Sequence, residues 1–412
     1  MGRSGRTVRM PAYMERFQCI GSRCEDNCCC ADWQVDVDRD SYSKYRNLRD
    51  GKMYSLLKEH VVRNRHKDVR EDNYARIRFV PGGCCPFLED TGLCRLHGEL
   101  GPDFLAKVCA TYPRISNDVG EVVERSGTCS CPEVVRIGLL SPEKMDFVER
   151  EESLRERVMI AQVFSSAAAN SMGLEDYLRL RQGAVDILQN RRYPLAQRLI
   201  ILGLLIMRIE ESRASESCPS INAIIEEIMG AVAQGSLADA LGTLPVNPGL
   251  QFQILKVLAD KRFAMGISSK RYIQCFGDFL NGMGCTQEAS HEAVAERYVQ
   301  AHGLYYVPYM DPNAHVFENY LVNQVFKSLF PLGRETLFDA YMLLVIGYSL
   351  IKMNLIGMGA CHKGLTDELV VKLIQSFSKT TDHCPAFTDE VLALMKQNNL
   401  DTLAFMAVLI QN

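Results

Sequence analysis

The chain lacks the features that mark secreted, membrane-spanning and nucleic-acid-binding proteins. The apolar core of a secretory signal, about 7–15 residues long, does not follow the opening Met-Gly-Arg-Ser-Gly-Arg-Thr. The longest apolar run, at 337–356, contains Asp339 and Lys352, whereas a membrane span needs roughly 18 uncharged residues. The 46 Lys and Arg residues are outnumbered by 50 Asp and Glu residues, and the net charge is −4. We therefore predict a cytoplasmic protein with no membrane insertion and no nucleic-acid partner.

Cysteine, by contrast, is abundant and unevenly distributed. Eleven of the 16 cysteines lie within the first 131 residues, at Cys19, Cys24, Cys28, Cys29, Cys30, Cys84, Cys85, Cys94, Cys109, Cys129 and Cys131. Such clusters form disulfides, metal sites or iron–sulfur clusters. Because the cytoplasm keeps thiols reduced, we expect metal or cluster binding here rather than disulfides.

The cysteine spacing matches no common metal-binding pattern. Cys24-x3-Cys28 falls in the range of zinc knuckles, but the sequence has no C-x2-C. The radical-SAM signature C-x3-C-x2-C begins at Cys24 and Cys28 but is not completed, because position 31 is Ala31. We favour an iron–sulfur cluster, with zinc as the alternative. Neighbouring side chains of an extended segment point to opposite sides. Unless the backbone turns sharply, Cys28 and Cys29 therefore serve two centres, or only one of them is a ligand.

Seven of the 16 cysteines are interpreted as buried packing thiols that bind no metal. This group consists of Cys30, Cys84 and the five C-terminal cysteines Cys218, Cys275, Cys285, Cys361 and Cys384.

The sequence predicts a mainly α protein in three parts. Residues 1–10 are expected to be a flexible N-terminus, and 11–140 a Cys-rich cluster-binding module with little regular structure, apart from one or two small strands. Residues 141–412 are expected to form an all-α helical domain. Its helices are predicted at 174–189, 194–213, 219–234, 249–263, 269–282, 286–302, 313–329, 335–356, 365–378 and 388–411. The run Leu199–Met207 is apolar on all sides, which predicts a buried central helix.

Several motifs together resemble the flagellin lysine-N-methylases, the FliB-like proteins. They are Phe17-Gln18-Cys19 through Cys28-Cys29, Cys85-Pro86-Phe87-Leu88, Cys109-Ala110-Thr111-Tyr112-Pro113-Arg114, Ser130-Cys131-Pro132-Glu133 and, in the helical half, Phe317-Glu318-Asn319-Tyr320-Leu321-Val322-Asn323 and Leu329-Phe330-Pro331. The segment Cys30-Ala31-Asp32-Trp33 departs from the family pattern, which usually has Gly-Trp one residue after the double cysteine.

The resemblance implies methyl transfer from S-adenosylmethionine to surface lysines of flagellin, with an iron–sulfur cluster (most simply 4Fe-4S) on the N-terminal cysteines. The implied ligands are Cys19, Cys24, Cys28, Cys29, Cys85, Cys94, Cys109 and Cys131. The extra Cys30 and Cys84 beside these motif cysteines blur which thiol of each run is the ligand.

A lysine amine must lose its proton before it can attack a methyl group, since its ordinary pKa is about 10.4. An aromatic and carbonyl-lined slot favours the neutral amine. We predict Tyr112, Glu318 and Tyr320 as catalytic residues, and Asn319 and Asn323 as residues that bind the donor. The competing interpretation places Tyr320 in the core and uses both asparagines to bond between helices.

The sequence shows no Gly-rich turn between a strand and a helix, as in Rossmann-type methyltransferases. An iron with three cysteine ligands would instead have an open position for the donor's amino and carboxylate groups. Two other functions fit the composition: a non-catalytic zinc- or iron-binding adaptor, and a radical or redox enzyme that uses the cluster for electron transfer.

Overall fold

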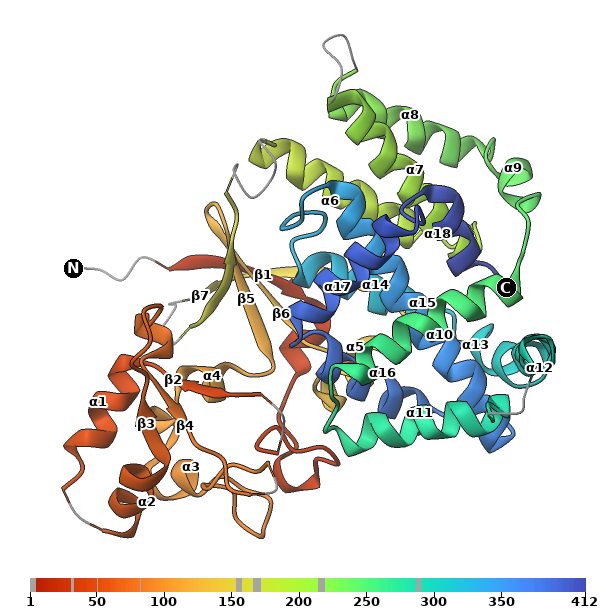
Figure 1. Cartoon of the computed structure of the whole chain (residues 1–412). Coiled ribbons are helices and arrows are strands. Elements are labelled where there is room, and N and C mark those ends of the chain that lie inside the picture. Colours follow the sequence, from red (N-terminus) through yellow and green to blue (C-terminus); the bar gives the residue numbers. More distant parts are fainter. Residues whose placement is uncertain are drawn as a thin grey trace.

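The computed structural model describes residues 5–30, 33–49, 51–81, 83–152, 158–165, 172–213, 219–286 and 290–412. Figure 1 shows a small module with three short strands and short helices, a mixed sheet beside it that contains the first strand, and a large body of helices on the far side of that sheet. The mainly α class predicted from the sequence is confirmed.

The small module is built on a three-stranded antiparallel sheet. Its strands are β2 (Val35–Val37), β4 (Ala75–Ile77) and β3 (Val61–Arg63), in that order. Helices α1 (Arg39–Asn47), α2 (Lys52–His60), α3 (Arg95–Leu100) and α4 (Lys107–Thr111) surround it, with 3₁₀ turns at Glu71–Asn73 and Pro102–Phe104. Two further 3₁₀ turns, Ala12–Arg16 and Gly21–Arg23, precede the module in the chain, and Tyr13 and Met14 of the first pack in the core of the helices. Val37, Tyr45 and Phe87 lie in the module's separate small core.

A second, five-stranded sheet separates this module from the helices. Its order is β7 (Phe147–Glu152), β1 (Arg6–Pro11), β6 (Val122–Gly127), β5 (Arg114–Val119) and β8 (Ile160–Val163). Strands β1 and β6 are parallel, as are β5 and β8, and the other pairs are antiparallel. Of the stretch 1–10, which was expected to be a flexible N-terminus, the structure describes residues 5–10, and Arg6 to Met10 belong to strand β1. Its alternating Val8 and Met10 are buried, and this burial holds the strand in the sheet.

The rest of the chain is helical. The elements are α5 (Pro132–Leu139), α6 (Leu174–Leu188), α7 (Leu195–Arg213), α8 (Ile221–Gln234), α9 (Ala238–Gly242), α10 (Pro248–Ala264), α11 (Lys270–Met283), α12 (His291–Ala301), a π-helical turn (His302–Tyr306), α13 (Val307–Met310), α14 (His315–Lys327), α15 (Leu337–His362), α16 (Asp367–Thr381), α17 (Pro385–Gln397) and α18 (Leu403–Ile410). Helix α7 is the buried central helix that its apolar run predicts.

Two helices differ from the expected boundaries. The helix expected at 388–411 is two helices, because Asn399 adopts a left-handed conformation (φ 53°) and Thr402 caps α18 by accepting a hydrogen bond from the Phe405 N–H. Helix α15 runs to His362 and is long and apolar enough to span a bilayer. However, 89% of its most apolar window is buried inside the fold, as in the core helix of a globular domain.

The hydrophobic cores divide the chain elsewhere than at residues 140 and 141. Residues of β1, β6 and α5, such as Val8, Val123 and Val135, belong to the same core as the helices. Only the stretch from about Val35 to Val108 packs around the small core. The Cys-rich segments therefore lie between two cores, with Cys85 in the small one and Cys129 and Cys131 in the large one.

Candidate functional site

The backbone turns sharply at the cysteine run. The Cys30 N–H donates to the Asn27 carbonyl at 3.1 Å, and the Cys29 N–H donates to Asn27 Oδ1 at 2.8 Å. The turn removes the alternation of an extended strand. Cys28 and Cys29 consequently approach each other closely enough for their side chains to hydrogen bond. Both side chains of the pair can therefore face one metal centre. The sequence allowed this only if the backbone turned sharply between them.

Five of the predicted ligands form one group of thiols around this turn. The side chain of Cys29 forms hydrogen bonds with those of Cys28 and Cys85 and lies within electrostatic reach of Cys109. Cys94 and Cys109 are each within reach of Cys28. The Cys85 N–H also donates to the Cys29 carbonyl at 2.8 Å, which fixes the two chain segments together.

The other three predicted ligands lie on the side of the sheet. Cys131 is within electrostatic reach of Cys24 and Cys19, and Cys24 is within reach of Cys28. All eight predicted ligands are thus neighbours, although they come from segments up to about 110 residues apart. Of the eight, Cys19, Cys28 and Cys109 are exposed to solvent.

Cys30 and Cys84 correct one expectation. They were interpreted as packing thiols in a chain without disulfides, but the structure joins them in a disulfide across an antiparallel bridge, with their Cα atoms 4.2 Å apart. The reason is positional, because directly opposed residues of an antiparallel pair bring their Cβ atoms together. The disulfide removes these two sulfurs from the set of free thiols. Cys28 and Cys29 then remain free in the first run, and Cys85 remains free in the second.

Burial keeps several of the free thiols protonated. It raises the pKa of Cys129 and Cys131 to about 12 each, and it also raises the pKa of the half-buried Cys94. A metal that binds these sulfurs must therefore displace their protons. Among the described residues, no three of the N-terminal cysteine sulfurs lie within 4.8 Å of one another.

Helix α16 attaches the cysteine loop to the helical domain. Lys379 binds Asp26 at 2.8 Å and donates to the Cys30 carbonyl at 3.1 Å, and its ammonium lies 5.4 Å from the centre of the Trp33 ring. Gln375 donates to Asp26 at 2.6 Å and to the Ser130 carbonyl at 3.0 Å. The cysteine loop and the helical body are thus held in a fixed relation.

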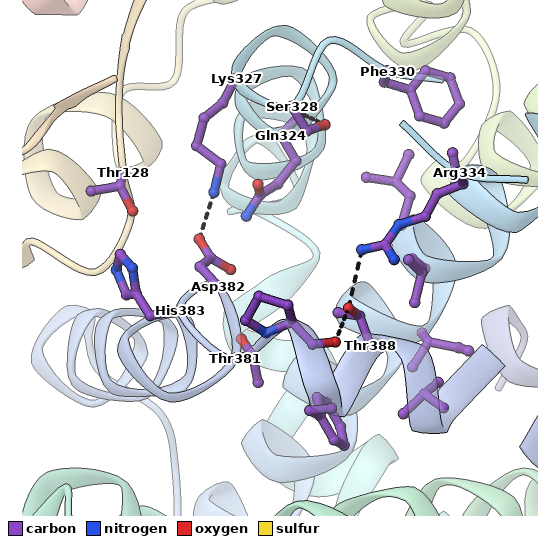
Figure 2. A pocket seen from close by; sticks show the side chains of 18 of the residues that line it. Thr128, Gln324, Lys327, Ser328, Phe330, Arg334, Thr381, Asp382, His383 and Thr388 are labelled. Carbon is purple, nitrogen blue, oxygen red and sulfur yellow. Dashed lines mark hydrogen bonds and ion pairs between the residues drawn. The ribbon is translucent and has the colours of Figure 1, made fainter. Parts of the chain in front are cut away.

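A cavity of about 500 Å³ opens on the helical side of this junction (Figure 2). Its lining comes from β5, β8, α14, the turn after α14, α15, α16 and α17. The apolar part includes Phe330, Leu343, Leu350, Phe377 and Phe387. Cavities of about 300–1,000 Å³ with mixed linings are typical of small-molecule sites.

The cavity carries two separate groups of polar side chains, one around Asp382 and one around Arg334 (Figure 2). Lys327 of α14 forms an ion pair with Asp382, which follows α16. Arg334 binds Asp389 at 2.8 Å and Thr388 at 3.0 Å. These pairs give the cavity both charges within an apolar surrounding.

The cavity and the cysteine site share a wall. His383 lines the cavity, its Nε2 lies 3.2 Å from Ser130 Oγ, and its ring packs edge-on against Trp33 with centroids 5.0 Å apart. Ser130 lies between Cys129 and Cys131. Desolvation lowers the pKa of His383, so its imidazole is neutral at pH 7. The neutral ring can donate a hydrogen bond to Ser130 or accept one from it, depending on its tautomer, and places no charge in the wall.

Two of the five residues predicted for catalysis and donor binding are near this wall. Tyr320 lines the cavity, and burial raises its pKa well above the usual value. Tyr112 lies on the cysteine side, where its hydroxyl is 3.2 Å from Ser130 Oγ and its ring is 5.4 Å from that of Trp33.

The other three predicted residues make contacts away from the cavity lining. The Glu318 carboxylate is bound by Arg191, at 2.9 Å, and by Arg198, at 2.7 Å. Asn319 donates to the Ser141 carbonyl at 2.9 Å. Asn323 accepts from the Tyr13 hydroxyl at 2.6 Å and donates to the Gly127 carbonyl at 3.0 Å. These contacts tie α14 to its neighbours, which was the competing interpretation of the asparagines.

Sequence reasoning missed Lys327, Arg334, Asp382 and His383. A signal was present in Thr381-Asp382-His383-Cys384-Pro385, a polar stretch between two apolar helices and one that ends in a helix breaker. Nothing in the sequence paired Asp382 with Lys327, which lies 55 residues earlier.

Comparison with known families decides the relationship. The model of the FliB lysine N-methylase C-terminal domain matches residues 181–409, which is more than half of the chain. The chain belongs to the FliB lysine N-methylase family. The resemblance seen in the motifs is thereby confirmed, and the cavity lies largely within the matched domain of this FliB-family chain.

Individual relatives agree with this assignment. Proteins named lysine-N-methylase from Salmonella typhimurium strain LT2 and Salmonella choleraesuis strain SC-B67 are each 24% identical over 389 residues, and the match covers 92% of both chains. The flagellar biosynthetic protein FliU of Salmonella muenchen is 27% identical over 154 residues, which is 37% of this chain and 89% of FliU. No solved structure matches the chain.

Proposed function

We propose that this protein transfers methyl groups from S-adenosylmethionine to lysine side chains of flagellin. The observation that carries the proposal is the cavity beside the cysteine site, which combines a carboxylate, a lysine amine and apolar walls. Relatives that match 92% of the chain are named lysine-N-methylase, and another is named a flagellar biosynthetic protein. These names support the reaction and the choice of flagellin as substrate.

The donor fits the cavity by size and polarity. A volume of about 500 Å³ lies within the range of small-molecule sites, and the apolar lining suits an adenine ring and a methionyl chain. Asp382 attracts the positive sulfonium, and the phenol ring of Tyr320 offers a cation–π contact. Arg334 and Lys327 are the cations available for the donor's carboxylate.

Asp382 and Lys327 also indicate how a substrate lysine is held. Their ion pair places one lysine amine on a carboxylate inside the cavity, and a substrate lysine that displaces Lys327 would meet the same partner. The Asp382 carboxylate holds the substrate as its ammonium, and apolar walls such as Phe377 and Phe387 favour the neutral form, so the amine becomes nucleophilic when Asp382 accepts its proton. Its nitrogen then bonds the methyl carbon as the carbon–sulfur bond of the donor breaks, and the products are methyl-lysine, S-adenosylhomocysteine and one proton.

The eight cysteines predicted as ligands fit an iron–sulfur centre better than a single zinc ion. Four sulfurs at about 2.3 Å from one zinc ion are only about 3.8 Å apart, whereas no three of these sulfurs lie within 4.8 Å of one another in the described part of the chain. A larger inorganic core holds its thiolates farther apart. When bound, the cluster would supply a Lewis-acidic iron on the cysteine side of the shared wall. His383 and Ser130 separate the cysteines from the cavity.

One assay tests the reaction class. Anaerobically reconstituted protein is incubated with flagellin and S-adenosylmethionine labelled in the methyl group, and lysine mass shifts and the nucleoside product are analysed. We expect methyl-lysine and S-adenosylhomocysteine without added reductant. An obligatory reductant together with 5′-deoxyadenosine would identify a redox enzyme. The absence of any lysine mass shift in cluster-loaded protein would leave only the adaptor function.

A variant tests the proposed cavity. Asp382→Asn keeps the size of the side chain but removes its charge, so we expect kcat/KM to fall by about 10²-fold. Asp260→Asn provides the control, because Asp260 forms an exposed ion pair with Lys256 on α10. Equal activity of the two variants would remove the methyl-transfer site from this cavity.

A further inference from the structure

Helices α11 and α15 approach each other unusually closely at two glycines. A Cβ atom on Gly282 would lie 1.9 Å from the Gly357 carbonyl oxygen, and a Cβ on Gly357 would lie 2.5 Å from the Phe279 side chain. No larger residue fits at either position without a shift of the backbone. Because the two backbones touch at these glycines, side chains about one turn away from Gly282 and Gly357 can reach one another.

Three metal-binding side chains meet at this point. Asp278 lies one turn before Gly282, and Cys361 and His362 lie about one turn after Gly357. Their ligand atoms all lie within 4.8 Å of one another, and His362 Nε2 is 3.0 Å from Asp278 Oδ2. The side chains of His362 and Asp278 are 39% and 17% exposed, so an ion can reach them from solvent.

The ligand types and the local field favour a zinc-like ion. Carboxylate, thiolate and imidazole together are typical zinc ligands, and three protein ligands leave a fourth position for water. His362 is the last residue of α15, where the partial negative charge of a long helix attracts a cation. Desolvation and the Asp278 carboxylate raise the pKa of the Cys361 thiol, and the Lys363 ammonium opposes them, so a bound ion must displace the Cys361 proton.

We propose that Asp278, Cys361 and His362 bind one divalent zinc-type ion, separately from the N-terminal cysteines. The ion joins the end of α15 to α11, and its binding releases the Cys361 proton to solvent. The site is about 16 Å along α15 from Leu350, the nearest residue of that helix in the cavity lining, so it is not part of the proposed methyl-transfer site. Cys361, interpreted from the sequence as a packing thiol, thereby acquires a role as a ligand.

Zinc content and affinity test this site. Full-length protein with its N-terminal cysteines loaded with iron is equilibrated with Zn²⁺ in the presence of a competing chelator. The wild type should hold about one equivalent more zinc than Cys361→Ser, and His362→Gln should weaken binding by about tenfold or more. Cys285→Ser is the control, since Cys285 is a half-buried thiol near the end of the same helix α11.

Cobalt supplies a second measurement. Co²⁺ in place of zinc should show a thiolate charge-transfer absorption that disappears in Cys361→Ser and persists in Cys285→Ser. Equal zinc content and an equal cobalt spectrum in wild type and Cys361→Ser would overturn the site. Neither readout depends on methyl transfer, so failure here is distinguishable from failure of the proposed activity.

Discussion

At the scale of single residues, the charge inside α15 is the clearest conflict between a side chain and its surroundings. Lys352 is 6% exposed, donates to the Ile410 carbonyl at 3.1 Å and lies between the rings of Tyr306 and Tyr348, at 6.0 and 5.8 Å. Desolvation lowers its pKa to about 7. The same residue interrupts the apolar run in the sequence, but only the structure shows that it is buried.

Lys352→Met should stabilise the protein at neutral pH. The pKa of Lys352 is about 7 in the folded state and about 10.4 in the unfolded chain, which therefore binds more protons between these pH values. The contribution of this group is fully present above about pH 10 and is lost as the pH falls towards 7. The stability gained by the variant should consequently be largest at pH 7 and shrink as the pH rises to about 10.

Urea unfolding of both proteins across this pH range measures the effect. Replacement of the exposed Lys58 by methionine controls for the introduction of methionine alone. If the gain in unfolding free energy of Lys352→Met stayed constant from pH 7 to 10, the pKa of Lys352 would not be depressed in the folded protein.

Residue types were easier to predict than residue partners. The resemblance to the FliB-like proteins selected the eight cysteines that the structure brings together, whereas their spacing alone matched no metal-binding pattern. The sequence could not show that Glu318 binds Arg191 and Arg198, each at least 120 residues earlier, or that Cys30 lies opposite Cys84. Such pairs depend on long-range packing, which no local pattern encodes.

At the scale of elements, the contact between α11 and α15 is controlled by its two glycines. A methyl group at Gly282 cannot be accommodated without a shift of the backbone, because the nearest atom is a carbonyl oxygen. A Cβ atom on Gly277, on the same helix, would meet no atom of another described residue within 4 Å. The two positions therefore make a matched pair.

Gly282→Ala should destabilise the protein by about 1–3 kcal/mol through overpacking. Gly277→Ala should stabilise it by about 0.5–1 kcal/mol, because alanine favours the helix. Urea midpoints of the two variants and the wild type provide the measurement. Opposite signs are expected, and a neutral Gly282→Ala would show that the helices separate without cost.

Helix positions followed from the sequence because the 3.6-residue pattern is local. Most helices of the C-terminal half begin and end within a few residues of the predicted bounds. The break between α17 and α18 was missed, since Asn399 and Thr402 are weaker signals than proline or glycine. The five-stranded sheet was missed too, because its strands come from residues 6–163 and pair in the order 7-1-6-5-8.

At the scale of the whole molecule, the cysteine site depends on both cores. Cys29, Cys85 and Cys94 pack against the small core, while Cys131 lies in the large core that includes the helices. Helix α16 then holds the loop through Lys379 and Asp26. A bound centre would therefore join the two parts of the chain, and its loss would loosen their junction.

Cys129 and Cys131 provide the sharpest test of that arrangement. Cys129 is enclosed, its sulfur accepts from Asn323 at 3.7 Å, and it faces the Lys327–Asp382 pair, whereas Cys131 faces Cys24. We expect Cys131→Ser to lose most of its iron after anaerobic reconstitution, and Cys129→Ser to retain it. Iron and sulfide content, with thermal unfolding of each variant, measure the effect. If Cys131→Ser kept its full iron content and Cys129→Ser lost iron, the ligand would be Cys129 and not Cys131, and the two-core arrangement of the site would have to be abandoned.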